Sequence, residues 1–312
     1  MARFLRHVPQ QMRSLGATLR LLTSSQVASR GDAVGQRFSS ELPAPPAGLL
    51  DDFVRYLGGD PGSYRGVVPP HFFCQWTFGS LLEAAATLPY PPLKVVNVGC
   101  GFRVNSPLPR GEPLAVETVI ESAEDDGYRA KIVFKLTTST PSSPGALESW
   151  VTARVLLKRK KSEGPRAPAK TVPVEARKLR HLRFRSNAGA EFARLTGDFN
   201  PLHYNDAYAR TVGFRSKILH GFASFGFCVE GLNRALLSGA AGRLVSVQSD
   251  FRRPVLLPGD ANLLLANVRG AEALSSNVVS PSGSPQSKGD FFLAPAARTI
   301  SYLEGQATWM SY

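Results

Sequence analysis

Two stretches of this 312-residue chain match each other in order and spacing, and this repeat constrains the fold more than any other feature. The second stretch lies 149 residues after the first. Each has the pattern of a strand, a turn containing proline and glycine, and another strand. The matched residues are Val98, Phe102, Arg103, Pro109 and Leu114 in the first copy, and Val247, Phe251, Arg252, Pro258 and Leu263 in the second. We therefore expect two copies of one strand-rich unit.

Two further features complete each copy of the repeat. A strand pattern of period two closes both halves, over residues 147–152 and 303–308. A helical run precedes the strands in each half, from Phe78 to Leu88 and from Gly221 to Leu237. Each unit is therefore expected to be a helix followed by strands.

A basic connector separates the two expected domains. Residues 158–174 contain Lys-Arg-Lys-Lys and several prolines, a composition typical of solvated linkers. We expect a first domain over residues 45–157 and a second over residues 175–312. No run of about 18 apolar residues occurs, so no transmembrane helix is expected. The three cysteines are far apart and odd in number, which excludes a disulfide framework and a cysteine-based zinc site of normal spacing.

The formal net charge of +13 taken alone suggests a nucleic acid or an acidic partner. This charge is concentrated in two segments, because residues 1–40 carry a net +5 and residues 154–185 a net +10. The rest of the chain has a net charge of −2, and the sequence holds no recognised nucleic-acid motif. An organellar protein associated with RNA or the ribosome is therefore the weaker interpretation of the charge.

The first 40 residues have the pattern of a mitochondrial transit peptide. Arginines recur every seven residues, and no acidic residue precedes Asp32. Arg37 to Ser40 resembles a mitochondrial processing site cut after Phe38. We expect this segment to direct the protein to the mitochondrial matrix, with a basic surface helix as the alternative. Apolar residues recur at helical spacing on a separate face, namely Leu5, Val8, Met12, Leu15, Leu19 and Leu22.

The densest group of polar residues lies over residues 195–203 and 220–221. Asp198 and His203 are separated by an Asn-Pro pair, and the proline prevents a continuous helix through the segment. Such a turn can direct a carboxylate and an imidazole at one water and move protons near neutral pH. Gly221 opens the second helix with an unhindered N–H, which suits an oxyanion donor. The same residue types also fit a capped turn and a structural histidine.

These motifs resemble the signature of the MaoC-like, (R)-specific enoyl-CoA hydratase family. The resemblance runs through residues 195–209, then Ile-Leu-His-Gly ending at Gly221, and then residues 251–260. The family has the hot-dog fold, in which an antiparallel sheet wraps a central helix. The resemblance therefore implies an α+β double hot-dog. It covers the second half of the chain well and the first half more weakly.

The resemblance also implies roles for individual residues. The family's catalytic aspartate falls on Asp198 and its catalytic histidine on His203. Asn200 matches the motif asparagine that helps to orient this pair. Gly221 matches the glycine whose backbone N–H binds the thioester oxygen, and His220 matches the preceding residue, whose role is less clear.

The first half carries a degenerate copy of the motif. Leu-Gly-Gly-Asp ending at Asp60 echoes Leu-Thr-Gly-Asp ending at Asp198, but Arg65 stands where the second copy has its histidine. We expect this half to be non-catalytic and, as in double hot-dog relatives, to help form an acyl tunnel. Three residues lie near the expected start of that tunnel and are interpreted first as core residues, namely His71, Cys74 and Trp76.

From the resemblance we expect a hydro-lyase of organellar fatty-acid metabolism, which interconverts trans-2-enoyl and (3R)-3-hydroxyacyl thioesters without a metal or other cofactor. Coenzyme A and acyl carrier protein share an anionic phosphopantetheine arm, so either carrier fits, and residues 154–185 would attract an acidic carrier protein. A non-catalytic acyl-binding scaffold is the alternative. Because two hot-dogs in one chain imitate the common hot-dog dimer, a monomer and a homodimer of double units both remain open.

Overall fold

The computed structural model describes residues 4–12, 16, 33–90, 95–157, 171–270, 286–297 and 300–311. Most of the expected linker, residues 158–170, lies outside this part of the chain, as do three of the apolar residues expected on an N-terminal helix, Leu15, Leu19 and Leu22. Among the helices that are described, none has the length and apolar character needed to cross a membrane.

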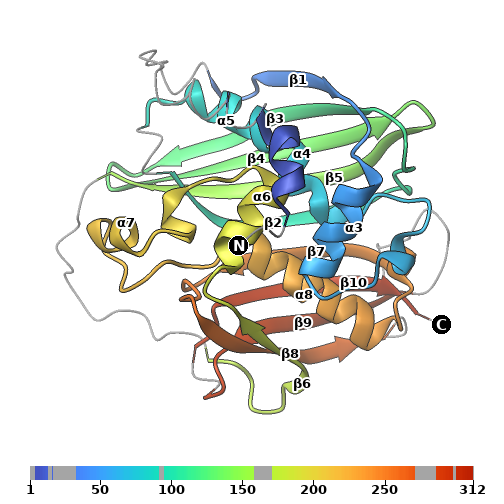
Figure 1. The fold of residues 1–312 in the computed structure, drawn as a ribbon, viewed down its shortest axis with the longest axis vertical. Coiled ribbons are helices and arrows are strands. Elements are labelled where there is room, and N and C mark those ends of the chain that lie inside the picture. The colour runs from blue at the N-terminus through green and yellow to red at the C-terminus, as the bar shows by residue number, and fades with distance from the viewer. Residues whose placement is uncertain are drawn as a thin grey trace.

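In the described residues, ten strands form one antiparallel sheet (Figure 1). Their order is β1-β3-β4-β5-β2-β7-β10-β9-β8-β6, so each half of the chain contributes five neighbouring strands. The strands are β1 (Arg37–Leu42), β2 (Val95–Val104), β3 (Leu114–Asp125), β4 (Arg129–Thr140), β5 (Ser143–Leu156), β6 (Arg177–Phe184), β7 (Leu244–Phe251), β8 (Gly259–Arg269), β9 (Gln286–Ala294) and β10 (Leu303–Met310).

Strands β2 and β7 join the two halves at the centre of the sheet. They pair antiparallel with Cys100 opposite Ser249, two residues that are 149 positions apart, which is the offset of the sequence repeat. A residue paired with its own counterpart marks a local twofold relation between the copies. Strands β5 and β10 flank this central pair in matching positions. The predicted repeat is confirmed.

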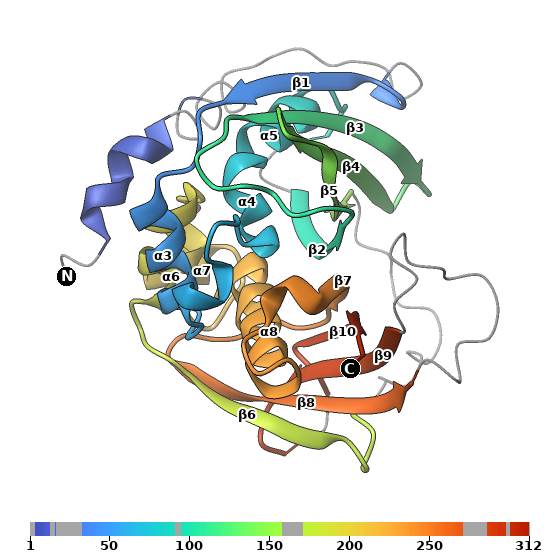
Figure 2. The same cartoon turned by 90° about the vertical axis from the view of Figure 1, so that its right-hand side faces the viewer.

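Helix α8 (Gly221–Leu236) lies inside the curve of the second half of the sheet (Figure 2). Every residue from Ala223 to Asn233 is buried, which is typical of a helix surrounded by protein. In the first half, α4 (Phe73–Trp76) and α5 (Phe78–Ala86) take this place as two pieces interrupted at Thr77. The two helices expected from the sequence are confirmed, and so is the α+β double hot-dog.

Shorter helices connect these central elements to the sheet and carry the polar motifs. They are η1 (Leu5–Gln11), α3 (Ala47–Tyr56), η2 (Pro61–Tyr64), η3 (Pro70–Phe72), α6 (Ala188–Thr196), η5 (Pro201–His203), α7 (Asp206–Thr211) and η6 (Ala241–Arg243).

The N-terminal residues pack onto this fold. Strand β1 pairs with β3 from Arg37 onward, so the predicted cut after Phe38 lies inside a strand. Helix η1 lies beside α3 and α6 (Figure 2). Leu5 and Met12, from the expected apolar face, are 50% and 61% exposed. The buried residues of η1 are polar, because their side chains find partners on the neighbouring helices.

Candidate active site

Helix α6 ends immediately before the first candidate catalytic residue. Gly197 closes the helix with φ of 86°, a left-handed conformation that glycine adopts without a Cβ clash. After Asp198, the Asn200 Oδ1 accepts from the Leu202 N–H at 3.1 Å and begins the short helix over Pro201–His203. The turn chemistry of this segment therefore brings His203 back toward Asp198. The structure thus gives Asn200 a role in shaping the backbone between the two.

The imidazole of His203 is held in one tautomer when neutral. Its Nδ1–H donates to the carbonyl oxygen of Ile218 at 3.0 Å, which leaves Nε2 with the lone pair. Gly189 of α6 packs directly against this residue, since a Cβ there would lie 1.8 Å from the His203 carbonyl oxygen. The sequence analysis missed Gly189. A glycine inside a helical run was the available signal, because it marks a close backbone approach.

His220 contacts both members of the candidate pair. Its Nε2–H donates to the backbone carbonyl oxygen of Asp198 at 3.1 Å, and the Asp198 Oδ2 lies 3.8 Å from the same nitrogen. The rings of His203 and His220 stack with their centroids 3.6 Å apart. Of the three side chains, that of Asp198 is the most open to solvent, at 21% exposed. His220, whose role the sequence left unclear, thus stacks on the imidazole of His203.

Burial sets the protonation states of the three groups. It raises the pKa of Asp198 above its ordinary value, although the nearby His203 and the N–H of Asn200 oppose this shift. Burial lowers the pKa of His203 against the opposing pull of Asp198, and it lowers the pKa of His220 much further, with His203 adding to the effect. Both imidazoles are therefore neutral near pH 7.

Gly221 is the first residue of α8, and the side chain of the preceding His220 does not cap this helix end by a hydrogen bond. The N-terminal N–H groups of a helix lack partners within the helix and carry the positive end of its dipole. A Cβ at Gly221 would lie 2.4 Å from the ring of Phe251, so a larger residue would have to displace that ring. Because His220 precedes Gly221 and stacks on His203, the helix end lies beside the imidazole of His203.

The ligand atoms of Asp198, His203 and His220 all lie within 4.8 Å of one another, a spacing that also suits a metal ion. The hydrogen bonds favour a different use. The Nε2 of His220 carries a proton because it donates to a carbonyl oxygen, so the lone pair of the neutral ring lies on Nδ1 instead. The arrangement is suited to holding and moving protons, and the expected absence of a metal stays a prediction.

The degenerate motif of the first half forms an exposed turn. Asp60 caps η2 by accepting from the Gly62 N–H at 2.9 Å. Both Asp60 and Arg65 are exposed. This carboxylate therefore serves the local backbone, as the sequence comparison of the two copies predicts.

His71, Cys74 and Trp76 are buried, which confirms their interpretation as core residues. Trp76 Nε1–H donates to a threonine of β4 at 3.1 Å, and His71 lies 3.2 Å from Glu230 of α8. Burial raises the pKa of the Cys74 thiol, and the charge of nearby Asp198 adds to this shift. The thiol is therefore protonated and unreactive at neutral pH.

Comparison with known proteins adds to this geometry. Residues 165–279 match the family described as MaoC like domain. The second half of this chain therefore contains a MaoC-like segment over residues 165–279. All four predicted site residues lie within this segment, namely Asp198, Asn200, His203 and Gly221.

Similarity to individual proteins extends beyond the MaoC-like segment. An enoyl-CoA hydratase of Mycobacterium tuberculosis is 28% identical over 220 residues, which are 66% of this chain and 75% of that protein. An (R)-specific enoyl-CoA hydratase of Rhodospirillum rubrum is 35% identical over 79 residues, 25% of this chain and 54% of that protein. A MaoC-like dehydratase structure from Phytophthora capsici has a TM-score of 0.70 at 15% identity and covers 91% of this chain and 98% of its own, so both halves share its fold.

Proposed function

We propose that this chain is a hydro-lyase that reversibly hydrates trans-2-enoyl thioesters to (3R)-3-hydroxyacyl thioesters. The observation that carries the proposal is the meeting of Asp198 and His203 beside the N terminus of α8 at Gly221. The hydratases among the relatives support this reaction class. The (R) configuration is supported by the motif resemblance and by the shorter of the two matches.

In the hydration direction, the thioester carbonyl oxygen accepts a hydrogen bond from the Gly221 N–H. The enolate-like charge that develops on this oxygen is stabilised there by the donor and by the helix dipole. A water held by Asp198 and His203 adds its oxygen to C3, and a proton is delivered to C2. One water O–H bond and the C2=C3 π bond break while the C3–O and C2–H σ bonds form, so no electrons are exchanged with a further group. The proposed reaction requires no cofactor besides the carrier arm of the substrate.

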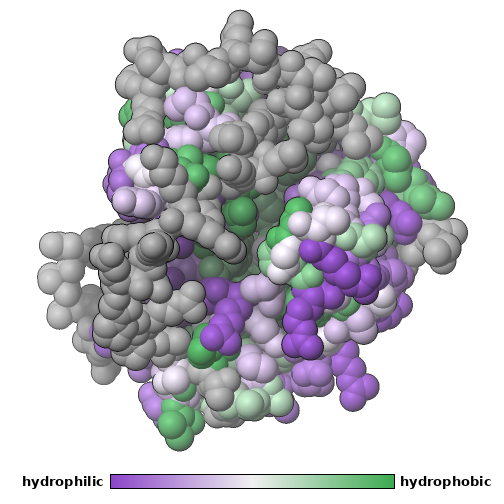
Figure 3. Space-filling model, turned by 90° about the vertical axis from the view of Figure 1, so that its left-hand side faces the viewer, coloured by the Kyte–Doolittle hydropathy of each residue, from purple (hydrophilic) through white to green (hydrophobic). Residues whose placement is uncertain are grey.

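One side of the surface has an apolar recess. On the side of the molecule where α7 lies, the surface is hollowed and apolar side chains line its floor (Figure 3). Helix α7 follows the catalytic turn directly in the chain. We therefore propose that the acyl chain lies against this part of the molecule, with the first half contributing to its binding.

We propose from the distribution of charge that the carrier of the acyl chain binds near strand β6. Strand β6 lies at an edge of the sheet and has exposed basic residues, including Arg177, Lys178 and Arg183. Coenzyme A and acyl carrier protein are both anionic, so this edge favours either one. A substrate panel that pairs each acyl length on both carriers tests this, and we expect the carrier-protein reaction to be the more sensitive to salt.

We also propose that the chain acts in the mitochondrial matrix, in fatty-acid metabolism. The arginine-rich, acid-poor N-terminus supports this address. Fusion of residues 1–40 to a fluorescent reporter tests it. Accumulation in mitochondria is the expected result, and a cytosolic reporter would contradict the proposal.

The proposed chemistry predicts that Asp198→Asn and His203→Gln each lower kcat by about 100- to 10,000-fold, because each removes a proton acceptor at the site. The assay follows the loss of enoyl absorbance with the full-length protein, and circular dichroism checks folding. Asp60→Asn is the matched control, since it changes the equivalent aspartate of the degenerate copy. Unchanged turnover in either site variant would refute the dyad, and acyl-CoA binding without turnover in the unmodified protein would favour the scaffold alternative.

A further inference from the structure

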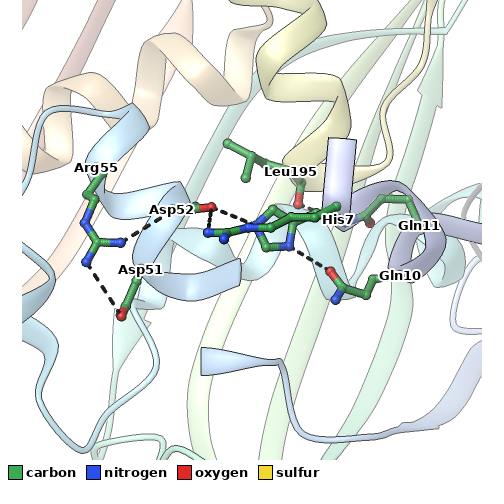
Figure 4. Close-up of polar contacts among 8 residues, drawn as sticks. His7, Gln10, Gln11, Asp51, Asp52, Arg55 and Leu195 are labelled. Atoms are coloured by element: carbon green, nitrogen blue, oxygen red, sulfur yellow. Dashed lines mark hydrogen bonds and ion pairs between the residues drawn. The ribbon is translucent and has the colours of Figure 1, made fainter. Parts of the chain in front are cut away.

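Polar contacts join the N-terminal helix η1 to α3 and to α6, the helix that ends shortly before Asp198 (Figure 4). His7 Nε2–H donates to the Asp52 carboxylate of α3 at 2.9 Å, and an Arg6 guanidinium nitrogen lies 2.5 Å from the same oxygen. His7 is only 3% exposed. Phe4 packs edge-on against Tyr56, whose hydroxyl donates to the Ala188 carbonyl oxygen at the start of α6. Residues 4–12 therefore contact both α3 and α6, the helix that ends two residues before Asp198.

Gln11 makes the contact nearest to the catalytic turn. Its side chain is fully buried, and its Nε2–H donates to the Leu195 carbonyl oxygen at 3.1 Å across 184 residues of sequence. The other end of the same amide is fixed as well, because the Oε1 accepts from Gln75 Nε2 at 3.1 Å. Gln11 thus links the first half of the chain to the last turn of α6.

The Leu195 carbonyl oxygen needs such a donor. In a longer helix it would accept from the N–H four residues on, that of Phe199. Here the helix ends at Gly197, and the Phe199 N–H bonds to the Gly197 carbonyl oxygen at 3.1 Å instead. The Gln11 Nε2–H donates to the Leu195 carbonyl oxygen in place of the Phe199 N–H, and it thereby caps the C-terminal end of α6. Asp198 lies only three residues beyond the capped carbonyl.

We infer that residues 4–12 are a positioning element of the active site, with Gln11 as its main contact, and that the working protein retains them. Only the predicted changes in kcat and in its pH profile rest on the proposed function. Retention of residues 4–12 is compatible with a targeting role for the N-terminus, because a targeting sequence need not be cleaved. It is incompatible with the predicted cut after Phe38, which would leave the Leu195 carbonyl oxygen, Gln75 and Asp52 without these partners.

The first test compares Gln11→Met with Gln10→Met in the full-length chain. Methionine keeps the length of glutamine and removes the donor, and Gln10 is an exposed neighbour whose contact is with His7 inside the segment. We expect Gln11→Met to lower kcat by about 3- to 10-fold with little change in KM, and to shift the acid limb of the kcat–pH profile. Gln10→Met should change all three less than Gln11→Met does, because the side chain of Gln10 bonds to His7 and not to α6. An unaltered kcat and pH profile in Gln11→Met would overturn the positioning role.

Hydrogen exchange separates this inference from the proposed function and does not depend on turnover. In Gln11→Met, the amides of residues 195–203 should exchange faster than in the unmodified protein, while those of α8 should not change. Equal protection of residues 195–203 would refute the inference even if the protein is an active hydratase. If the unmodified protein lacks hydratase activity but this difference appears, the proposed reaction fails and the positioning element stands.

The mass of the intact protein isolated from its own cells tests retention. A species that includes residues 4–12 is expected. A single mature species beginning at Ser39 would overturn the retention and would support the processing site expected from the sequence.

Discussion

The buried imidazole of His220 donates to the backbone of Asp198 and stacks beneath His203, so one side chain orients both members of the pair. The two contacts can be separated by substitution. His220→Gln keeps a donor at the required reach, whereas His220→Phe keeps a flat ring without the donor. Because the donor holds the backbone of Asp198 in place, we expect His220→Phe to lower kcat by about tenfold and His220→Gln by a smaller factor. Steady-state kinetics on the enoyl thioester measures both.

Equal losses in the two His220 variants would show that the hydrogen bond does not orient Asp198. A larger loss in His220→Gln than in His220→Phe would assign the main effect to ring stacking. Thermal unfolding of both variants controls for a general loss of structure.

Gly189 sets the distance between α6 and the turn that carries His203. A Cβ would lie 1.8 Å from the His203 carbonyl oxygen, so Gly189→Ala must displace one of the two backbones. A displacement of about 1 Å costs on the order of 100-fold in rate, and we expect a loss of that size in kcat. Gly48→Ala in α3 is the control, because its Cβ would meet nothing within 4 Å. Full activity in Gly189→Ala would contradict the packing described.

The candidate site residues that lie close together in the sequence could be predicted from it. Asp198, Asn200, His203 and Gly221 lie in two short motifs, and the turn-forming proline between them is visible in the sequence. Gln11 was not predictable, because its partner is 184 residues away and no local pattern records such a contact.

The central strand pair β2–β7 depends on small residues where the two halves meet. A Cβ at Gly101 would lie 2.4 Å from the Trp150 ring and 2.7 Å from the Val247 carbonyl oxygen. We expect Gly101→Ala to lower the free energy of unfolding by about 2–3 kcal/mol, because strand backbone and a packed ring cannot both relax. Urea denaturation measures the change. Gly79→Ala in α5 is the control, since open space surrounds its Cβ, and equal stability of the two variants would contradict the prediction.

At the level of elements, periodicity and the repeat predicted the two central helices and the duplicated strand order. The pairing of β1 with β3 was missed, because the arginine-rich, acid-poor sequence around it matched a targeting signal. Polar burial in η1 was missed for a related reason. A hydrophobic pattern identifies an apolar face, but His7 and Gln11 are buried through hydrogen bonds to other elements.

For the whole molecule, the lowered pKa values of His203 and His220 predict a loss of stability in mild acid. The pKa values of His203 and His220 are below the ordinary 6.5 in the folded chain. As the pH falls below about 6.5, the unfolded chain binds protons that the folded chain does not, so the free energy of unfolding decreases. The raised pKa of Asp198 acts in the opposite sense, between its ordinary 3.8 and its raised value.

We therefore expect the urea midpoint of unfolding to decrease as the pH is lowered from about 7.5 to about 5.5. The decrease should be less steep in His220→Phe, because this variant lacks one of the titrating groups. Urea unfolding at a series of pH values tests this. A midpoint independent of pH over that range, or an equal slope in the variant, would contradict the assignment of neutral buried histidines.

The joining of both halves in one chain has a consequence for how the protein can change. In a dimer of identical chains, every substitution appears twice, so any change in one central helix is imposed on the other. Here the central helix of the first half is interrupted at Thr77, while α8 remains continuous over 16 residues. A single mutation in α5 leaves the helix that begins at Gly221 with its original sequence. The gene for such a chain can accumulate variation in the helices of the first half without changing the residues of the candidate site in the second half.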